Sequence, residues 1–359
     1  MEYDETIIID NGSCFIKSGF SYEDSPKSYL RTCVGYPQNK DSTYSFGNLT
    51  IDQMNTLNLR YPFEDGAIKN WDDMEKIWDY IFNKELEVNP SEYNVILTQP
   101  LMNSKDEKEK MAQIMFEKFN ISSLYLAYSI DLAFYSSNRE SGLIVDLGAN
   151  STQISAFLYY SPIPYKFERL YYGGNAITDY LYHLLKQVQN KSIAEDIKEK
   201  ACYVALDYEK EIVEPFSYIL PDNKKIIIGK ERIQASETLF NPELFYKDSD
   251  LGLHRICNKI IENCKDDKEE IYKCIYLSGG NSLFKGLRER LTKELNYMAG
   301  YSYKGLVNVI DSEYGKFSVW MGGQILSKIS TFDKILTSKK MYEESGSSII
   351  YKNDNYMFK

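Results

Sequence analysis

The chain has 359 residues, of which 43% are hydrophobic and 26% are charged, and its net charge at pH 7 is −10. Such a length and composition predict a globular protein with room for two domains. The negative charge argues against a protein that binds nucleic acid directly by neutralising phosphates. No apolar run reaches the roughly 18–20 residues of a membrane span, and the acidic start MEYDET lacks the features of a signal peptide.

The cysteines and histidines argue against disulfides, zinc sites and histidine-based catalysis. The six cysteines form no Cys-x-x-Cys pair, so we expect reduced thiols in a reducing compartment. The two histidines, His183 and His254, lie far apart in sequence. We therefore expect a cytosolic protein, with the nucleus as the alternative. The cysteines are Cys14, Cys33, Cys202, Cys257, Cys264 and Cys274.

The first chemically informative stretch runs from Ile7 to Phe20. An apolar run ends in Asp10, a small polar turn follows, and a second strand-like run begins at Cys14. This pattern predicts a β-hairpin whose turn points backbone N–H groups into one concavity, which suits an anion. Asp10 ends a buried strand, so its carboxylate needs a cation or several hydrogen-bond donors nearby.

Between this turn and residue 140 the sequence alternates helical and strand-like segments. Residues 32–60 predict a small outer lobe with a mobile loop. Asn70 can cap a helix that continues to about residue 81. Residues 93–99 predict a buried strand, residues 105–120 a helix, and residues 124–137 a further apolar segment.

The hairpin pattern returns at residues 142–157. An apolar run again ends in an aspartate, Asp146, and a turn from Leu147 to Ser151 follows. A lone copy is usually an ordinary turn, but two copies suggest two similar half-molecules that face each other across a cleft. A triphosphate with Mg²⁺ suits such a pair, because Mg²⁺ keeps most of its waters and needs only one or two carboxylates nearby.

The remaining segments predict helices and one further glycine turn. A Gly173-Gly174 turn precedes a helix, and residues 191–213 and 250–272 have helical patterns. A strand ends at Gly279-Gly280, and a helix begins at Leu287; this arrangement often places a ligand close to the backbone. Residues 317–332 predict a buried helix, and Ser348 to Tyr351 read as a short strand.

Collinear motifs resemble actin and the actin-related proteins over nearly the whole chain. They are DNGS at 10–13, KSGF at 17–20, NWDDMEKIW at 70–78, EKMAQIMFEKFN at 109–120, DIKEKACYVALDYE at 196–209, LSGGNSL at 277–283, KFSVWMGGQIL at 316–326 and ISTF at 329–332. The resemblance implies an α/β protein with the actin-type ATPase fold: duplicated ribonuclease-H-like domains, each with a small outer subdomain, around a nucleotide cleft.

The resemblance also implies domain boundaries. The first large subdomain is expected at residues 1–31, 61–136 and 318–359, and its outer lobe at 32–60. The second large subdomain is expected at residues 137–172 and 248–317, and its outer lobe at 173–247. The mobile loop between Gly35 and Gly47 is about seven residues shorter than in actin, as judged from the resemblance.

The resemblance implies that the chain binds ATP or ADP with Mg²⁺ or Ca²⁺. Asp10 and Asp146 are expected to hold the cation through its waters. A glycine stands in the family where this chain has Cys14, and Phe284 replaces a tyrosine yet can still stack on a base. The implied nucleotide-binding residues are Asp10, Gly12, Ser13, Cys14, Phe15, Lys17, Gly148, Ala149, Asn150, Gly174, Lys198, Glu199, Gly279, Gly280, Asn281, Phe284 and Lys316.

The positions that orient the attacking water in actin differ here. Ser129 stands where the family has a glutamine, Ala149 where it has an aspartate, and Gln153 where it has a histidine. Ser129, Gln153 and Asp146 would then form a weakened water-positioning site. Losing one positioning group can cost on the order of 10²-fold in rate, so we expect slow or absent ATP hydrolysis with ATP binding retained.

The expected function is nucleotide-dependent assembly, in short filaments or in a multiprotein complex, in the cytoplasm and cytoskeleton. Expected partners are actin-like subunits, other cytoskeletal proteins and helices that bind a groove. The groove residues implied by the resemblance are Tyr135, Asn138, Ile325, Ile329, Thr331 and Ile335.

Three alternatives remain from the sequence. One is a fully active filament-forming actin, and another is an actin-related subunit of a nuclear chromatin-remodelling complex. The third is a sugar kinase of the same superfamily, which would need a carboxylate base in the cleft; Asp131 is the nearest candidate in sequence.

Overall fold

The computed structural model describes residues 5–37, 44–47, 49–245, 251–353 and 356. The chain divides into two compact units. The first unit comprises residues 1–138 and 317–359, and the second comprises residues 139–316. The predicted mobile loop lies partly outside the described residues, because these omit residues 38–43.

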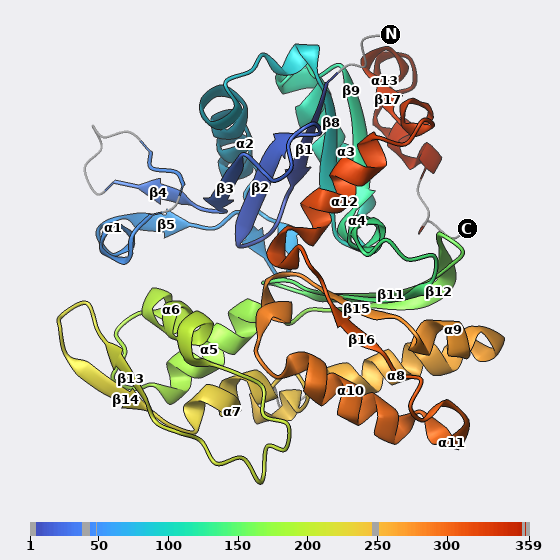
Figure 1. Ribbon diagram of the computed structural model, residues 1–359. Coiled ribbons are helices and arrows are strands. Elements are labelled where there is room, and N and C mark those ends of the chain that lie inside the picture. The colour runs from blue at the N-terminus through green and yellow to red at the C-terminus, as the bar shows by residue number, and fades with distance from the viewer. Residues whose placement is uncertain (1–4, 38–43, 48, 246–250, 354–355, 357–359) are drawn as a thin grey trace. The chain divides into compact units, whose positions relative to one another are not determined.

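The first unit is built on a six-stranded sheet with the order β17-β9-β8-β1-β2-β3 (Figure 1). β1 pairs antiparallel with β2 and parallel with β8, and β8 pairs parallel with β9. The strands are β1 Thr6–Asp10, β2 Phe15–Phe20, β3 Ser28–Arg31, β8 Asn94–Gln99, β9 Ser123–Tyr128 and β17 Thr337–Ser338. The predicted first hairpin and the predicted strand at 93–99 are thereby confirmed.

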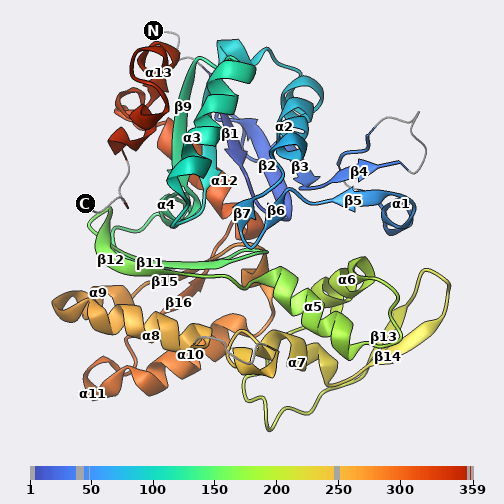
Figure 2. The same cartoon turned by 180° about the vertical axis from the view of Figure 1, so that it is seen from behind.

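Helices cover both faces of this sheet. α2 (Trp71–Tyr80) and α3 (Lys105–Gln113) lie on one face, and α4 (Ser129–Ser136) and α12 (Ser318–Ser327) lie on the other (Figures 1 and 2). As predicted, the side chain of Asn70 caps α2, where it accepts the N–H of Asp73. π-helical turns, Ile81–Leu86 and Ile114–Lys118, continue α2 and α3.

α4 and α12 pack closely because of glycine. A Cβ on Gly322 would lie 1.8 Å from the carbonyl oxygen of Leu132, and one on Gly323 would lie 2.8 Å from Ile8. Only glycine permits this backbone approach.

Shorter elements complete the first unit. They are β4 Val34–Tyr36, α1 Ile51–Thr56, β5 Asn58–Arg60, β6 Phe63–Glu64, β7 Ala67–Ile68 and α13 Lys339–Ser345. The prediction of a short strand at Ser348 to Tyr351 is wrong, since Ser347–Asn353 is a 3₁₀ helix. Its isoleucines, Ile349 and Ile350, pack against the core, which a short helical turn achieves as well as a strand.

The second unit repeats the strand order of the first. Its five-stranded sheet has the order β12-β11-β10-β15-β16, with β10 antiparallel to β11 and parallel to β15. The strands are β10 Gly142–Leu147, β11 Thr152–Leu158, β12 Ser161–Leu170, β15 Ile275–Ser278 and β16 Val309–Asp311. If the strands of each sheet are numbered in chain order, five neighbouring strands of both sheets lie in the order 3-2-1-4-5. The duplication predicted from the two turns therefore extends to the topology of the sheets.

The remaining elements of the second unit are mainly helices. α8 and α9 contact strands β10 to β12, and α10 contacts β16. The elements are α5 Gly174–Leu184, α6 Lys191–Ala201, β13 Phe216–Ile219, β14 Lys225–Ile228, α7 Glu231–Glu237, α8 Leu253–Asn263, α9 Lys268–Tyr272, α10 Leu287–Met298 and α11 Gly300–Tyr303.

The prediction of a helix over residues 191–213 is wrong beyond Ala201, where α6 ends. The backbone beyond it bonds to distant segments: Tyr203 N–H donates to Arg232 O, and Val204 N–H donates to Lys285 O. Val204 and Ala205 are buried, so their apolar pattern reflects tertiary packing of an extended segment.

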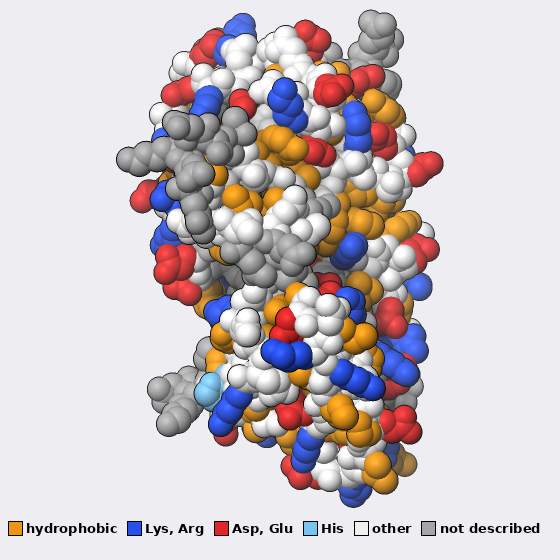
Figure 3. Space-filling view, turned by 90° about the vertical axis from the view of Figure 1, so that its left-hand side faces the viewer, with side chains coloured by type: hydrophobic (Ala, Val, Ile, Leu, Met, Phe, Trp, Pro, Cys, Tyr) orange, Lys and Arg blue, Asp and Glu red, His pale blue; other side chains and the backbone are white. Residues whose placement is uncertain are grey.

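The surface carries charges of both signs. Figure 3 shows acidic and basic side chains interspersed with hydrophobic ones over one face of the molecule. This distribution differs from the single basic stripe typical of nucleic-acid binders. Within the described part of the chain, none of the helices combines the length and apolar character needed to span a bilayer.

Candidate functional site: two glycine turns

The first turn, Asn11 to Cys14, is held by three hydrogen bonds to two neighbouring segments. The Thr32 hydroxyl donates to Gly12 O at 2.7 Å, and the Thr32 N–H donates to Cys14 O at 2.8 Å. The Asn11 N–H donates to the hydroxyl of Thr98 at 2.8 Å. These bonds fix the turn from outside, so its shape is established before any ligand arrives.

Asp10 is 4% exposed at the end of β1, and its charge is compensated. Lys17 lies opposite it in the hairpin register, with Nζ 2.9 Å from Oδ2. The Thr98 hydroxyl donates to Oδ1 at 3.3 Å. The cation and donor that the sequence required for a buried carboxylate are therefore present.

The second turn, Gly148 to Ser151, closes on itself and is then held by α5. Gly148 N–H donates to Ser151 O at 3.0 Å. The first amides of α5 donate back to the turn, from Gly174 to Gly148 O at 3.0 Å and from Asn175 to Ala149 O at 2.8 Å. The N-terminus of α5 thus lies directly against this turn, and a helix N-terminus favours anions.

Asp146 is 6% exposed at the end of β10 and accepts hydrogen bonds from neutral groups. The Ser278 hydroxyl donates to Oδ1 at 3.1 Å, and the Gln153 side-chain amide lies 3.5 Å from Oδ2. Gln153 is opposite Asp146 in the β10–β11 register. The structure therefore brings together Asp146 and Gln153, two residues of the predicted water-positioning site.

A third glycine segment, Gly279 to Asn281, joins this arrangement. Asn281 donates its side-chain amide to Gly148 O at 2.7 Å. Lys198 is buried and donates to Gly174 O at 3.0 Å. One hydrogen-bonded cluster thus joins residues that are spread over more than 130 positions of sequence, namely Gly148, Gly174, Lys198 and Asn281.

Glycine is required at several of these positions. A Cβ on Gly12 would lie 2.3 Å from Phe15 O, and one on Gly173 would lie 2.4 Å from Gly148 O. Gly279 has φ +85°, and a Cβ there would lie 2.5 Å from Leu147 O. A Cβ on Gly280 would meet nothing within 4 Å, so the backbone at Gly280 borders open space.

The other predicted site residues differ in exposure. Ser13, Cys14 and Phe15 are half-buried, as are Ala149 and Asn150. Glu199 is exposed near the end of α6, whereas Phe284 and Lys316 are half-buried. Ser129 is the first residue of α4 in the first unit and is 9% exposed.

The sequence interpretation missed three residues that bond to the turns. Thr98 and Ser278 each donate to one aspartate, and Thr32 holds the first turn. Thr98 is the penultimate residue of β8, which is parallel to β1, and Ser278 is the last residue of β15, which is parallel to β10. The sequence did hold a signal for Thr98 and Ser278, since each lies near the end of an apolar run that predicts a strand. The carboxyl ends of parallel strands meet at one edge of a sheet, so a polar residue there can reach the aspartate of the neighbouring strand.

The chemistry of the carboxylates suits a hydrated cation. In the described part of the chain, no three histidine, cysteine or acidic side chains cluster closely enough to hold a metal ion. Each turn instead offers one carboxylate at its strand end. Mg²⁺ needs little more, because it is usually bound through one or two carboxylates, its waters and substrate phosphates.

The predicted groove residues lie where α4 and α12 end. Tyr135 and Ile325 are half-buried on these helices, and Ile329 beyond α12 is 45% exposed. Ile335 is half-buried after a short 3₁₀ turn. Burial raises the pKa of the Tyr135 phenol, and the nearby Asp131 raises it further, so Tyr135 is neutral at physiological pH.

All six cysteines are free thiols, in agreement with the expectation from their spacing. Burial raises the pKa of the Cys202 thiol to about 12 and those of Cys264 and Cys274 to about 11. Cys14 differs from the others, because it is half-buried within the first turn and the Arg31 guanidinium lies 3.8 Å from its Sγ.

The protein-family model described as Actin matches residues 1–190 and residues 185–354. Together the two matches include every residue of both turns, the whole second unit and the first unit as far as residue 354.

Proposed function

Because the chain belongs to the actin family, we propose that it binds ATP with a divalent cation and acts by nucleotide-dependent assembly, with little or no ATP hydrolysis. The mixed α/β architecture with two multi-stranded sheets is that of the two-domain actin-type fold. The proposal rests mainly on one observation: each sheet presents a glycine turn and one buried carboxylate at the end of its central strand.

Each turn by itself suits a phosphate group. Both are fixed by side chains and backbone from other segments, and close backbone contacts require glycine at positions 12 and 279. The second turn adds the N-terminus of α5, where partial positive charge favours phosphate oxygens. Asp10 and Asp146 would hold a hydrated Mg²⁺, which when bound neutralises charge on the phosphates. Lys17 would add a positive charge beside the first turn.

Binding is tested by titrating the protein with ATP and Mg²⁺ in a calorimeter. We expect one nucleotide per chain, and a Gly280→Val variant should weaken binding, because its side chain would project into open space beside the turn. The matched control is Gly229→Val, at a glycine that also lacks a positive φ and whose Cβ would meet only the Glu231 carboxylate, at 3.5 Å. The proposal would be refuted if the protein bound neither ATP nor ADP at a stoichiometry near one per chain.

The residues at the water-positioning sites support slow hydrolysis. Ser129 is too short to hold a water that a glutamine side chain would reach, and Ala149 offers no polar group. The Gln153 amide lies 3.5 Å from Asp146, and this contact ties up part of its hydrogen-bonding capacity. Rate depends on holding the water in line with the phosphate.

Hydrolysis is tested by phosphate release from the wild-type protein and the Ser129→Gln variant. We expect slow release from the wild type and an increase of roughly 10-fold or more in the variant, because one positioning group is typically worth this much or more. Ser136→Gln, at the end of the same helix, serves as the control. Release from the wild type at the rate of ordinary filament actin would contradict the proposal.

Assembly is supported by the half-buried and exposed apolar side chains Tyr135, Ile325 and Ile329 at the ends of α4 and α12. Such a surface suits a partner helix or an actin-like subunit. We expect ATP-dependent sedimentation in Mg²⁺ and salt, or co-purification within a complex, and Ile329→Asp should reduce it. We also propose the cytoplasm and cytoskeleton as the location.

One contact argues against a sugar kinase. Asp131, the candidate base for that reaction, is 3% exposed, and its carboxylate accepts a hydrogen bond from Tyr356. A general base must instead reach the hydroxyl of a bound substrate.

A further inference from the structure

The C-terminal segment contacts the beginning of α4 through Tyr356. The Tyr356 hydroxyl donates to Oδ1 of Asp131 at 2.7 Å. Its ring packs edge-on against Tyr128, with ring centroids 4.6 Å apart. Asp131 and Tyr128 are 3% and 4% exposed. A residue near the end of the chain therefore reaches a carboxylate and a ring that are both deeply buried.

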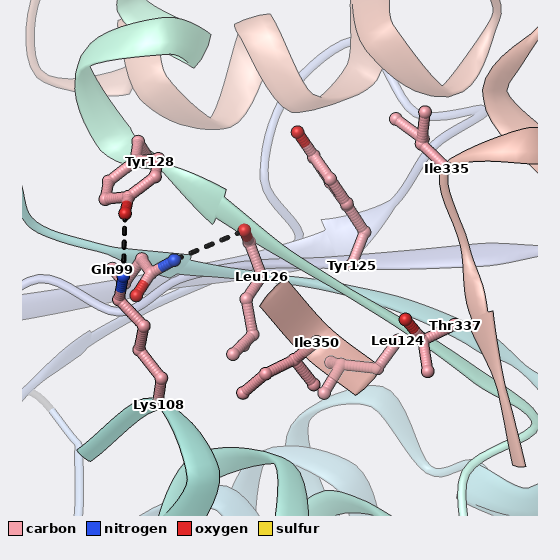
Figure 4. A pocket seen from close by; sticks show the side chains of 9 residues that line it. All are labelled: Gln99, Lys108, Leu124, Tyr125, Leu126, Tyr128, Ile335, Thr337 and Ile350. Carbon is pink, nitrogen blue, oxygen red and sulfur yellow. Dashed lines mark hydrogen bonds between the residues drawn. The ribbon is translucent and has the colours of Figure 1, made fainter. Parts of the chain in front are cut away.

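The contact continues to α3. Lys108 is 4% exposed, and its Nζ donates to the hydroxyl of Tyr128 at 2.8 Å (Figure 4). Figure 4 also shows Leu124, Leu126 and Ile350, which line the same pocket as this pair. Tyr128 is thus held by Lys108 through its hydroxyl and by Tyr356 against its ring.

These contacts fall on the first turn of α4. Tyr128 is the N-cap, Ser129 the first helical residue and Asp131 the third. The side chain of Tyr128 makes no capping hydrogen bond, so the N-cap does not stabilise this turn in the usual way. The later part of the helix is held differently, by the close packing of Leu132 against Gly322 of α12.

Ser129 lies within the segment that Tyr356 holds. We propose that Tyr356 is a positioning residue, which fastens the first turn of α4 and thereby places Ser129 for the nucleotide site. This inference rests on the proposed function, because Ser129 is assigned to the nucleotide site there. Displacement of the C-terminal segment would then loosen the turn and change how long the nucleotide stays bound.

The test compares Tyr356→Phe with Tyr351→Phe. The first change removes the hydroxyl that bonds to Asp131 and keeps the ring. The second removes the hydroxyl of Tyr351, which lies in the same segment but donates to Glu109 and to Lys105 O on α3. Both variants lose a hydroxyl that bonds to a carboxylate, and only Tyr356→Phe acts on α4.

Two quantities are measured in each variant. Amide hydrogen exchange of residues 129–133 reports the opening of the first turn, and release of a fluorescent ATP analogue reports nucleotide retention. We expect Tyr356→Phe to raise both rates by roughly tenfold or more, the factor expected for one lost hydrogen bond to a charged group. Tyr351→Phe should leave both rates within about twofold of the wild type.

A second pair of variants separates positioning from general loss of structure. Asp131→Asn keeps an acceptor for the Tyr356 hydroxyl and should preserve slow exchange at residues 129–133. Asp131→Leu removes the acceptor and should reproduce the effect of Tyr356→Phe. Unchanged exchange in Tyr356→Phe, or equal effects of Tyr356→Phe and Tyr351→Phe on nucleotide release, would overturn the inference.

Failure of the proposed function gives a different result. If the wild-type protein binds no ATP analogue, the proposed function fails, and with it the link from Tyr356 to the nucleotide. If the wild type binds the analogue and Tyr356→Phe accelerates only the exchange of residues 129–133, nucleotide binding stands and the positioning role is refuted.

Discussion

The two glycine turns occupy equivalent places in sheets of the same strand order, yet their aspartates are stabilised differently. Asp10 faces the ammonium of Lys17 at 2.9 Å, across the hairpin. At the position equivalent to Lys17, the second hairpin has Gln153, whose neutral amide lies 3.5 Å from Asp146. A hydroxyl completes each arrangement, from Thr98 in the first turn and Ser278 in the second.

This difference shows how a duplicated scaffold can divide its tasks. In the first turn the carboxylate charge is already neutralised by a neighbour, so Asp10 contributes strongly to the stability of the hairpin. In the second turn a hydroxyl and an amide, from Ser278 and Gln153, orient the carboxylate. We therefore expect the first turn to lose more stability when its partner is removed. We also expect Asp10 to contribute less to a divalent cation, because Lys17 already offsets its charge.

The largest expected effect comes from Lys17→Met. Removing the ammonium leaves Asp10 charged at a site that is 4% exposed, so unfolding free energy should fall by about 3 kcal/mol. The equivalent change in the second turn, Gln153→Leu, should cost about 1 kcal/mol. Urea unfolding of the nucleotide-free variants measures both. Equal losses would contradict the comparison, and the double variant Asp10→Asn with Lys17→Met should recover part of the loss.

Alanine at Gly279 should destabilise the second unit by roughly 2–3 kcal/mol. Its φ of +85° is unfavourable for alanine, and the new Cβ would lie 2.5 Å from Leu147 O. Gly280→Ala is the matched control, because its Cβ meets nothing within 4 Å. Gly12→Ala should destabilise the first unit through its 2.3 Å contact with Phe15 O. Thermal unfolding measures the stability of each variant. A Gly279→Ala protein as stable as the Gly280→Ala control would be inconsistent with a tightly fixed turn.

Asparagine substitutions separate the roles of the two carboxylates in cation binding. We expect Asp146→Asn to weaken Mg²⁺-dependent nucleotide affinity by about 10-fold or more. Asp10→Asn should weaken it less, because Lys17 already neutralises much of that charge. Titration with ATP at fixed and varied Mg²⁺ measures both effects. A larger effect of Asp10→Asn would reverse the division of tasks proposed here.

The smallest expected effects come from the hydroxyl donors. Ser278→Ala removes one hydrogen bond to a buried carboxylate and should reduce the free energy of unfolding by about 1 kcal/mol. Thr98→Val removes the bond to Asp10 and also the acceptor of the Asn11 N–H, so it should cost somewhat more, although Asp10 retains the lysine. Denaturant unfolding of the two variants measures both losses, and a Thr98→Val protein as stable as the wild type would contradict the role of Thr98 in holding the first turn.

Much of the fold could be predicted from local patterns in the sequence. The two turns, the Asn70 cap and the helix that begins at Leu287 depend on residues close together in the chain, and the structure agrees with each. The segment after Ala201 could not be predicted this way. Its backbone bonds to residues about 30 and 80 positions away, so an apolar pattern that fits a helix is satisfied by an extended chain.

The partners of the site were harder to predict for the same reason. Thr98 and Ser278 reach Asp10 and Asp146 because β8 and β15 lie parallel to β1 and β10, in a register that a single sequence does not specify. Asn281, by contrast, was identified through the resemblance of LSGGNSL, and its amide does bond to the second turn. The predicted division into large and outer subdomains stays a prediction, as do the roles assigned to the site residues.

The most direct test of the account is the identity and fate of the nucleotide in the purified protein. The nucleotide is extracted and identified by chromatography, and phosphate release is followed after addition of Mg²⁺ and polymerising salt. We expect bound ATP that persists over many hours, with little phosphate released. Rapid phosphate release that coincides with sedimentation would instead indicate a fully active filament actin, and would contradict the role assigned to Ser129.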